Sequence, residues 1–269
     1  MQKTLRVGPI LFLAVLGLCV AVSVLVAWAT DDSEISFSKA ELFFELNNTD
    51  GDLSFHALID GEQLKSLEIS DSKGKRVLEI SVNNRLQSQG FSELFFESVE
   101  HGFEEILPQT FFRQYPKGIY EITGKVLDGT QLTRQVTLTH VMPASPEPTV
   151  NTLPMAKQCD PEESGFDITV TSAPVTIAWP AVTTSHPNSH GRGADSQLPV
   201  SVEIHHYEVE VEVVNGALPS LLNVILPPSE TSITIPEEFI SLGKEFKYEV
   251  VVSENSFNQT EIESCFTLK

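Results

Sequence analysis

Four histidines are the residues whose type and spacing come nearest to a chemical site. His186 and His190 lie in a stretch rich in serine, proline and glycine, and His205 and His206 precede an expected strand that carries Glu208. If the long loop folded over that strand, the imidazoles and the carboxylate would form a zinc or copper site. Histidines scattered along a solvated polar loop give the same pattern, and we favour this second interpretation. We therefore expect no metal site.

Residues 48–52, Asn-Thr-Asp-Gly-Asp, are similar to part of a calcium-binding loop. Aligning Gly51 with the sixth position of such a loop places Leu46 first and Ala57 twelfth, where acidic ligands are required. A hairpin turn explains the Asp-Gly pair more simply, because the glycine tolerates positive φ.

Glu208, Glu210 and Glu212 alternate with apolar residues along one expected strand. Carboxylates two residues apart on a strand lie ~6.5–7 Å from each other, near the spacing used in glycoside hydrolysis. However, charge along an exposed edge strand is also the ordinary guard against sheet-to-sheet aggregation. The sequence places no stacking aromatic residue beside them, so we expect no catalytic residue here.

The charge balance and the motifs missing from the sequence argue against nucleic-acid binding and against several classes of enzyme. The chain has 269 residues, 17 Lys+Arg against 37 Asp+Glu, and a formal net charge of −20. Nucleic-acid binding is not expected, because phosphate contacts need clustered Lys and Arg. The G-x-S-x-G and H-E-x-x-H motifs are missing from the sequence, as are phosphate-loop and dinucleotide motifs. We predict no cofactor and a protein that is not an enzyme.

The N-terminus predicts export. Lys3 and Arg6 precede an uncharged apolar run, and Ala27-Trp28-Ala29 has the small-x-small form of a cleavage site. We interpret residues 1–29 as a signal peptide, with an uncleaved anchor as the alternative because the run approaches the length of a membrane span. Loss of Lys3 and Arg6 leaves 15 basic and 37 acidic residues, a net charge of −22. We expect the rest to be extracytoplasmic (periplasmic, secreted or anchored facing outward), without further membrane contact.

A proline-rich segment suggests two domains. Residues 142–154 contain four prolines in thirteen residues, a composition that favours extended linkers. We predict a β domain at 33–141, a linker at 142–158 and a second β domain at 159–269. Short β-branched or aromatic runs at 8–12-residue spacing on both sides indicate an all-β fold of two tandem antiparallel Ig-like β-sandwiches. Asp50-Gly51, Asp60-Gly61 and Asp128-Gly129 are expected hairpin turns, and residues 107–115 an expected helical turn.

Two cysteines remain once Cys19 leaves with the leader. Cys159 and Cys265 are then an even pair in an oxidising compartment, where a disulfide is the default expectation. Such a bridge would close a loop of about 106 residues.

The second half resembles a fibronectin type III domain over residues 166–269. Residues 175–182, Val-Thr-Ile-Ala-Trp-Pro-Ala-Val, are similar to the family's B strand with its tryptophan, Trp179. Tyr207 opens a strand like the family's C strand, and Leu242 stands six residues before Tyr248, as at the E–F corner. The resemblance implies a core signature of Trp179, Tyr207, Leu242 and Tyr248, with the Tyr248 hydroxyl bonded back to the turn. Lys244 replaces the family's corner proline.

The first half carries a shorter resemblance. Residues 116–120 have the P-x-G-x-Y pattern seen at the entry to an F strand in bacterial immunoglobulin-like domains. The whole chain is similar to exported bacterial proteins that carry a fibronectin type III domain, with an Ig-like β domain before it. This resemblance implies an interaction or spacer role. We therefore expect a binding or spacer protein that contacts an unidentified protein or cell-surface partner, with a carbohydrate- or metal-binding accessory module as the alternative.

Two further features bear on exposed surfaces. Asn47 and Asn258 formally fit N-glycosylation sequons. Phenylalanines occur as adjacent pairs at positions 43–44, 95–96 and 111–112. In a strand one member of each pair points away from the core, which would offer a partner-binding patch unless another element covers it.

Overall fold

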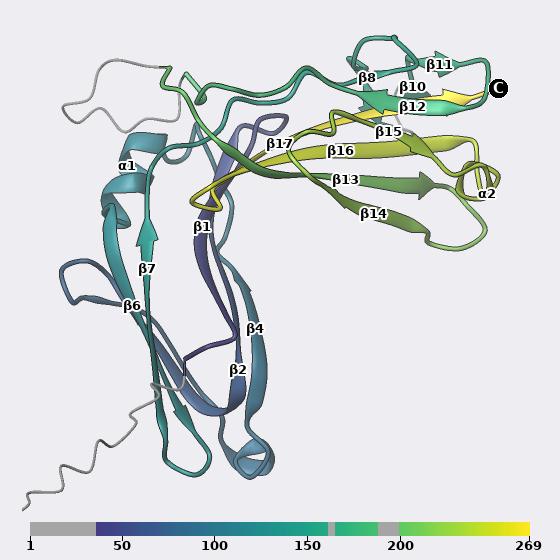
Figure 1. Ribbon diagram of the computed structural model, residues 1–269. Coiled ribbons are helices and arrows are strands. Elements are labelled where there is room, and N and C mark those ends of the chain that lie inside the picture. The colour runs from purple at the N-terminus through teal and green to yellow at the C-terminus, as the bar shows by residue number, and fades with distance from the viewer. Residues whose placement is uncertain (1–35, 161–164, 188–198) are drawn as a thin grey trace, which may run out of the picture. The chain divides into compact units, whose positions relative to one another are not determined.

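The computed structural model describes residues 36–160, 165–187 and 199–269 (Figure 1). The predicted leader at residues 1–29 and His190 lie outside these described residues. Strands predominate, and the α-helices in the described chain are the short α1 (Pro108–Gln114) and α2 (Glu237–Ile240). No helix in the same described ranges combines the length and the apolar character needed to cross a bilayer. The expectation of a mostly β protein is confirmed.

Two layers of strands enclose the hydrophobic core of the second half (Figure 1). One layer has the order β14-β13-β16-β17, and the other is the three-stranded sheet β15-β12-β8. Their bounds are β8 Thr149–Val150, β12 Val175–Ala178, β13 Ile204–Val214, β14 Leu221–Leu226, β15 Ser232–Ile235, β16 Glu245–Glu254 and β17 Gln259–Leu268. The short strands β9 (Cys159–Asp160), β10 (Gly165–Phe166) and β11 (Thr169–Val170) complete this half, and β11 pairs in parallel with β17.

Alternation of side chains along β13 (Ile204–Val214) sets its register. Tyr207, Val209, Val211 and Val213 are all at most 4% exposed, whereas the intervening glutamates face outward. A slip of one residue would bury three carboxylates in place of this apolar row. The predicted alternation is confirmed, but β13 lies between β14 and β16 rather than at an edge.

The core signature implied by the family resemblance is only partly present. Trp179, Tyr207 and Tyr248 are buried, and the Trp179 and Tyr207 rings lie 5.3 Å apart. Leu242, however, is 50% exposed, so its assignment to the core was wrong. The helical turn α2 explains the difference, because it directs Ile240 into the core in its place, at 6% exposure.

The expected hydrogen bond at the E–F corner is also missing. The buried Tyr248 hydroxyl has no hydrogen-bond partner among the described residues, although Ser264 is its cross-strand neighbour. The corresponding contact occurs in the first half, where Tyr120 donates from its hydroxyl to Pro116 O at 3.0 Å. The P-x-G-x-Y pattern therefore marks the tyrosine that bonds back to its own turn.

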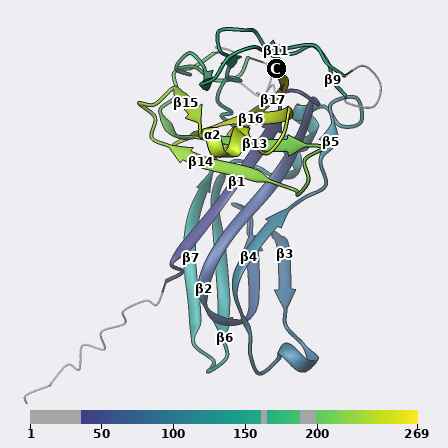
Figure 2. The ribbon, with the colours of Figure 1, turned by 90° about the vertical axis from the view of Figure 1, so that its right-hand side faces the viewer.

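The strands of the first half are joined through one long strand, β2 (Asp52–Ser70). Its first part pairs with β1 and β4, and its second part pairs with β3 and β6. Figures 1 and 2 both show β2 beside β4. The other bounds are β1 Lys39–Asn47, β3 Arg76–Ser81, the 3-10 turn Asn84–Leu86, β4 Phe91–Glu97, β5 His101–Gly102, β6 Gly118–Val126 and β7 Gln131–Leu138. These strands share one hydrogen-bonded network in which the order is β1-β2-β6-β7.

The hairpin turn expected at Asp60-Gly61 does not form. Both residues lie inside β2, at the point where its register with β4 shifts. A Cβ on Gly61 would come within 3.0 Å of the Phe37 ring. The glycine therefore serves close packing of Phe37 on the strand, whereas Gly51 and Gly129 adopt positive φ in the two turns that do form.

Helix α1 covers the aromatic end of the first core. Pro108 is its first residue, as predicted, and Phe111 and Phe112 are buried against Phe44 at centroid distances of 5.8 and 5.0 Å. Of the three phenylalanine pairs, only Phe95 has a largely exposed ring, at 62%. The proposed aromatic patch is thus reduced to one side chain.

The segment at residues 142–158 is tied to both halves. Met142 is fully buried in the first core, and Val150 of β8 is fully buried in the second. Thr260 donates from its hydroxyl to Pro143 O at 2.7 Å. In addition, β1 pairs in parallel with β17, Glu45–Asn47 matching Gln259–Glu261. These residues are packed structure, whereas the domain boundaries proposed from the proline content stay a prediction.

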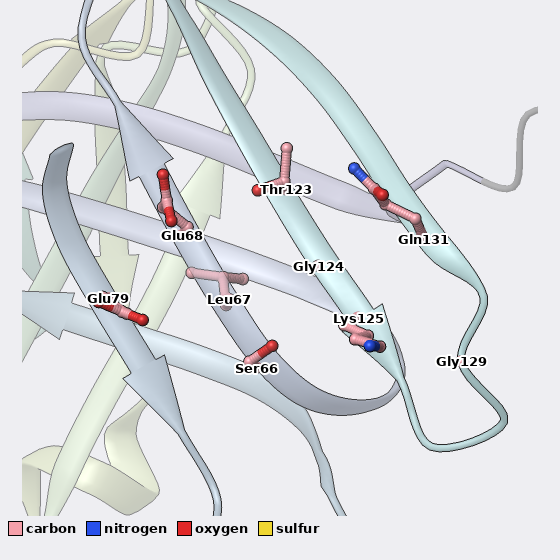
Figure 3. Close-up of a pocket in the computed structure, with 9 residues that line it drawn as sticks. All are labelled: Ser66, Leu67, Glu68, Glu79, Thr123, Gly124, Lys125, Gly129 and Gln131. Carbon is pink, nitrogen blue, oxygen red and sulfur yellow. The ribbon is translucent and has the colours of Figure 1, made fainter. Parts of the chain in front are cut away.

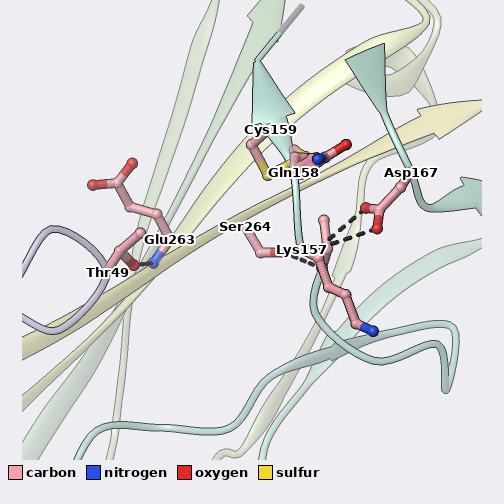
Figure 4. Close-up of a disulfide and its surroundings, with 9 residues drawn as sticks. Thr49, Lys157, Gln158, Cys159, Asp167, Glu263 and Ser264 are labelled. Atoms are coloured by element: carbon pink, nitrogen blue, oxygen red, sulfur yellow. Dashed lines mark hydrogen bonds between the residues drawn. A yellow bond between two sulfur atoms is a disulfide. The ribbon is translucent and has the colours of Figure 1, made fainter. Parts of the chain in front are cut away.

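The predicted disulfide is present. Cys159 of β9 is bonded to Cys265 of β17, with a Cα–Cα distance of 5.6 Å (Figure 4). Beside it, the backbone N–H of Lys157 donates to the Asp167 carboxylate, and Ser264 Oγ accepts from the N–H of Ala156. The bridge and these bonds together hold the start of the second half against β17.

Candidate binding surface on an acidic sheet face

Glutamates from four adjacent strands share the outer face of the large sheet. Glu210 of β13 stands opposite Glu249 of β16, which stands opposite Glu263 of β17. Cross-strand partners point to the same side of a sheet, so the carboxylates form one surface. We call this surface the acidic sheet face; it comprises Glu208, Glu210, Glu249, Glu261, Glu263 and, on β1, Glu45.

Burial and mutual repulsion raise the pKa values of three of these carboxyls. Burial, followed by the charges of Glu97 and Glu100, raises the pKa of Glu45 to about 8. Burial together with Glu45 and Glu249 raises the pKa of Glu261 to about 9. For Glu249 the pKa rises to about 7, through burial and then Glu263. Near neutral pH, Glu45 and Glu261 are therefore mostly protonated and Glu249 is about half protonated, so these three carboxyls add only part of a negative charge to the face.

Two neutral amides donate to carboxylates of this face, and Lys247 of β16, opposite Glu212, places a cation on the same side of the sheet. Asn223 of β14 donates to Glu208 Oε1 at 2.5 Å and also to Glu210 Oε1. Asn47 donates from Nδ2 to Glu263 Oε1 at 2.9 Å. An amide stabilises a carboxylate without cancelling its charge, so the face remains attractive to cations.

Ser54, His56 and Glu45 come nearest, among the described residues, to a nucleophile, base and carboxylate set. Ser54 Oγ lies 2.6 Å from His56 Nε2, and Glu45 Oε1 lies 3.5 Å from the same nitrogen. A catalytic relay needs hydroxyl and carboxylate on opposite nitrogens of the ring. His56 is also only 3% exposed, its ring stacks on Phe43, and burial lowers its pKa to about 4. The trio is a buried polar contact rather than a reaction centre.

The histidines considered for metal binding make other contacts. His186 is 7% exposed, and its Nε2 lies 3.0 Å from Asn48 Oδ1. The Nδ1 atoms of His205 and His206 lie 2.7 Å apart, and His205 packs on the Phe257 ring. Within the described ranges no group of three or more His, Cys, Asp or Glu side chains is arranged to hold a metal ion.

The loop at residues 48–52 is a hairpin turn. Asn47 Oδ1 accepts hydrogen bonds from the N–H groups of Thr49 and Asp50, and Gly51 N–H donates to Asn47 O. Thr49 Oγ1 in turn accepts from the N–H of Glu263 (Figure 4). The predicted Asp-Gly turn is confirmed, and Thr49 ties it to β17.

The two formal glycosylation sites are not accessible. Asn47 is 7% exposed and Asn258 is fully buried, and both side chains are hydrogen-bonded within the fold. An asparagine must lie on the surface to accept a glycan. Neither sequon therefore offers a modification site in the folded chain.

A shallow depression of about 240 Å³ lies over strands β2, β3, β6 and β7 (Figure 3). Glu68 and Glu79 line it, and Arg76 pairs with both, at 2.9 Å and 2.5 Å. Apart from Lys125 and Leu67, the rest of its lining is serine, threonine, glutamine and glycine. It lacks the convergent polar groups and apolar walls of a ligand site.

Comparison with known proteins adds a distant structural likeness only. No protein-family model matches the chain, and no curated protein is similar to it in sequence. Among solved structures, the chicken CNTN1 FN1-FN3 domains share 12% identity and a TM-score of 0.30, over 85% of this chain and 66% of that one. A two-domain fibronectin type III segment of chicken tenascin gives 13% identity and a TM-score of 0.24, over 86% and 98% of the two chains. Part of a 1.5-MDa bacterial ice-binding adhesin gives 13% and 0.24, over 86% and 65%. Overlaps this weak carry no information on what the chain binds.

The sequence patterns predicted only the part of the acidic sheet face that lies on β13. The alternating glutamates of β13 were recognised, but Glu249, Glu261 and Glu45 were not grouped with them. A local signal exists in the alternation of Glu261, Ile262 and Glu263. The pairing of β17 with β1, more than 200 residues away in the chain, has no such signal.

Proposed function

We propose that the chain is an exported, non-enzymatic protein that binds or spaces other proteins through the surfaces of its β-sandwich domains. The observation that carries this proposal is the acidic sheet face, which continues across β13, β16, β17 and β1. A broad, carboxylate-rich surface suits docking by charge complementarity. The Cys159–Cys265 disulfide supports an extracytoplasmic location, because such bonds persist in oxidising compartments.

The proposal is tested by binding to intact cells. The protein, purified as its own cells export it and fluorescently labelled, is expected to bind the cell surface saturably and to be displaced by unlabelled protein. A double variant, Glu208→Gln with Glu210→Gln, should weaken binding several-fold. The matched double variant Glu237→Gln with Glu238→Gln removes two exposed charges of α2 and should leave binding unchanged. Absence of saturable binding, or turnover of a small substrate, would overturn the proposal.

A further inference from the structure

Strand β14 differs from the other free edges of the large sheet. Among the described strands of six or more residues, β3, β4, β7 and β14 pair on one side only. Natural proteins usually place charges on such edges to prevent pairing with another chain. Arg76 and Glu79 lie on β3, Glu93 and Glu97 on β4, and Arg134 on β7. The six residues of β14, Leu-Leu-Asn-Val-Ile-Leu, carry no charge.

Two of the three side chains on the exposed side of β14 are apolar, and the third is Asn223. Leu221 is 60% exposed and Ile225 is 65% exposed, and Leu218, in the loop before the strand, is 73% exposed. A strand edge that combines free backbone donors and acceptors with uncovered apolar side chains is suited to the addition of a further strand. Because β14 lacks the charges that usually prevent pairing at a sheet edge, a further strand can pair with it.

The charges on the neighbouring strand, β13, indicate which side chains an added strand should carry. Ile225 stands opposite Glu208, Asn223 opposite Glu210, and Leu221 opposite Glu212, so three carboxylates line the same face one strand further in. On the far side of β13, Lys247 of β16 stands opposite Glu212, which leaves Glu208 and Glu210 as the carboxylates without a basic residue as cross-strand partner on β14 or β16. An added strand would lie about 10 Å from β13. Lysine or arginine side chains can cover Leu221 and Ile225 with their aliphatic stems while their charged ends reach toward these glutamates.

From this arrangement we propose that β14 receives an extended basic segment of a partner protein, with Lys or Arg at alternate positions, as an additional strand. The inference rests on the proposed binding function and names its surface and partner. Charge complementarity favours this occupant over a second copy of the chain, because two copies would bring two rows of glutamates together at a net charge of −20 each.

The test uses synthetic heptapeptides and the protein as its cells export it. The capped peptide KVKTKVK is expected to bind, and hydrogen exchange should slow at the amides of β14. The peptide KVKPKVK keeps the charge but breaks the strand and removes one N–H, so its affinity should fall about tenfold. The peptide EVETEVE should not bind, because its charges match those of β13.

Two matched variants locate the site. Ile225→Lys places on β14 the kind of charge that the other edges carry, and should weaken KVKTKVK binding about tenfold. Ile119→Lys makes the same change at a side chain that is 55% exposed on β6, and should leave affinity within about twofold. Both positions are exposed, so circular dichroism and thermal unfolding should match the wild type.

Several outcomes would overturn the inference: no binding of KVKTKVK, equal binding of KVKPKVK, protection of amides outside β14, or self-association in sedimentation that Ile225→Lys abolishes. The inference alone fails if cells are still bound saturably and Ile225→Lys has no effect on that binding. The proposed function fails with it only when saturable binding to cells is itself missing.

Discussion

Asn258 Oδ1 accepts a hydrogen bond from the backbone N–H of Phe44 at 2.9 Å, across 214 residues of sequence. Its Nδ2 donates to Val141 O and to Thr139 Oγ1, each at 2.9 Å. The side chain is fully buried. One amide therefore connects the turn between β16 and β17 with β1 and with the segment that follows β7.

Replacing Asn258 by alanine should lower the free energy of unfolding by about 2–3 kcal/mol, because it leaves buried donors and acceptors without partners. Urea unfolding measures this loss. Asn255→Ala is the matched control, since Asn255 is exposed in the same turn and donates to Glu203 at 2.8 Å; its effect should stay within about 0.5 kcal/mol. Equal effects of the two variants would show that the buried amide is not a structural contact.

Reduction of the Cys159–Cys265 bond should destabilise the folded chain by up to about 4–5 kcal/mol, because the bond constrains a long loop of the unfolded chain. The measurement compares urea unfolding with and without a reductant, while a thiol assay verifies that the bond has opened. Cys159→Ser with Cys265→Ser should behave like the reduced wild type. An unchanged midpoint after complete reduction would contradict the expectation.

Tyr120→Phe should cost about 1 kcal/mol, because it removes the bond from the tyrosine hydroxyl to Pro116 O and leaves that carbonyl unpaired. Tyr248→Phe should be neutral or stabilising, since its buried hydroxyl has no partner in the described chain. Both side chains are almost fully buried, so the pair of variants separates the hydrogen bond from the ring packing. Thermal or urea unfolding of the two variants gives the comparison, and the opposite order would refute it.

The stability of the fold should fall as pH rises from about 6.5 to 9. Glu45, Glu249 and Glu261 have folded pKa values of about 8, 7 and 9, above the ordinary value of 4.5. A carboxyl with a raised folded pKa contributes stability that is complete below its unfolded pKa and is lost as pH rises through its folded pKa. Urea midpoints measured across this range should therefore decrease.

Below about pH 6.5, His56 makes the stability of the fold fall as the pH is lowered. Its pKa is lowered to about 4, so the stability it contributes is present above about 6.5 and is lost as pH falls toward 4. Between pH 4.5 and 6.5 a rise in pH lowers stability through the three glutamates and raises it through His56, so the two contributions oppose each other. Glu45→Gln should flatten the decline above pH 6.5, and Glu62→Gln, at an exposed position, should leave it unchanged. A decline that persists in full in Glu45→Gln would remove the carboxyl explanation.

Local sequence patterns are sufficient to predict several individual elements of this fold. Alternation of apolar and acidic residues predicts β13 and its buried face, proline predicts the start of α1, and Asp-Gly pairs predict the turns at Gly51 and Gly129. These features depend on side-chain spacing and backbone preferences within a few residues. The even pair of cysteines likewise predicts the disulfide from the count alone.

Other features of the fold depend on packing and pairing between segments that are distant in the sequence. Asp60-Gly61 lies inside a strand because Phe37 packs against the glycine, and α2 leaves Leu242 exposed by placing Ile240 in the core. The pairing of β1 with β17, and the acidic face that it extends, depends on backbone hydrogen bonds between segments more than 200 residues apart. Those bonds use groups that every residue carries, so no local pattern of side chains reveals them.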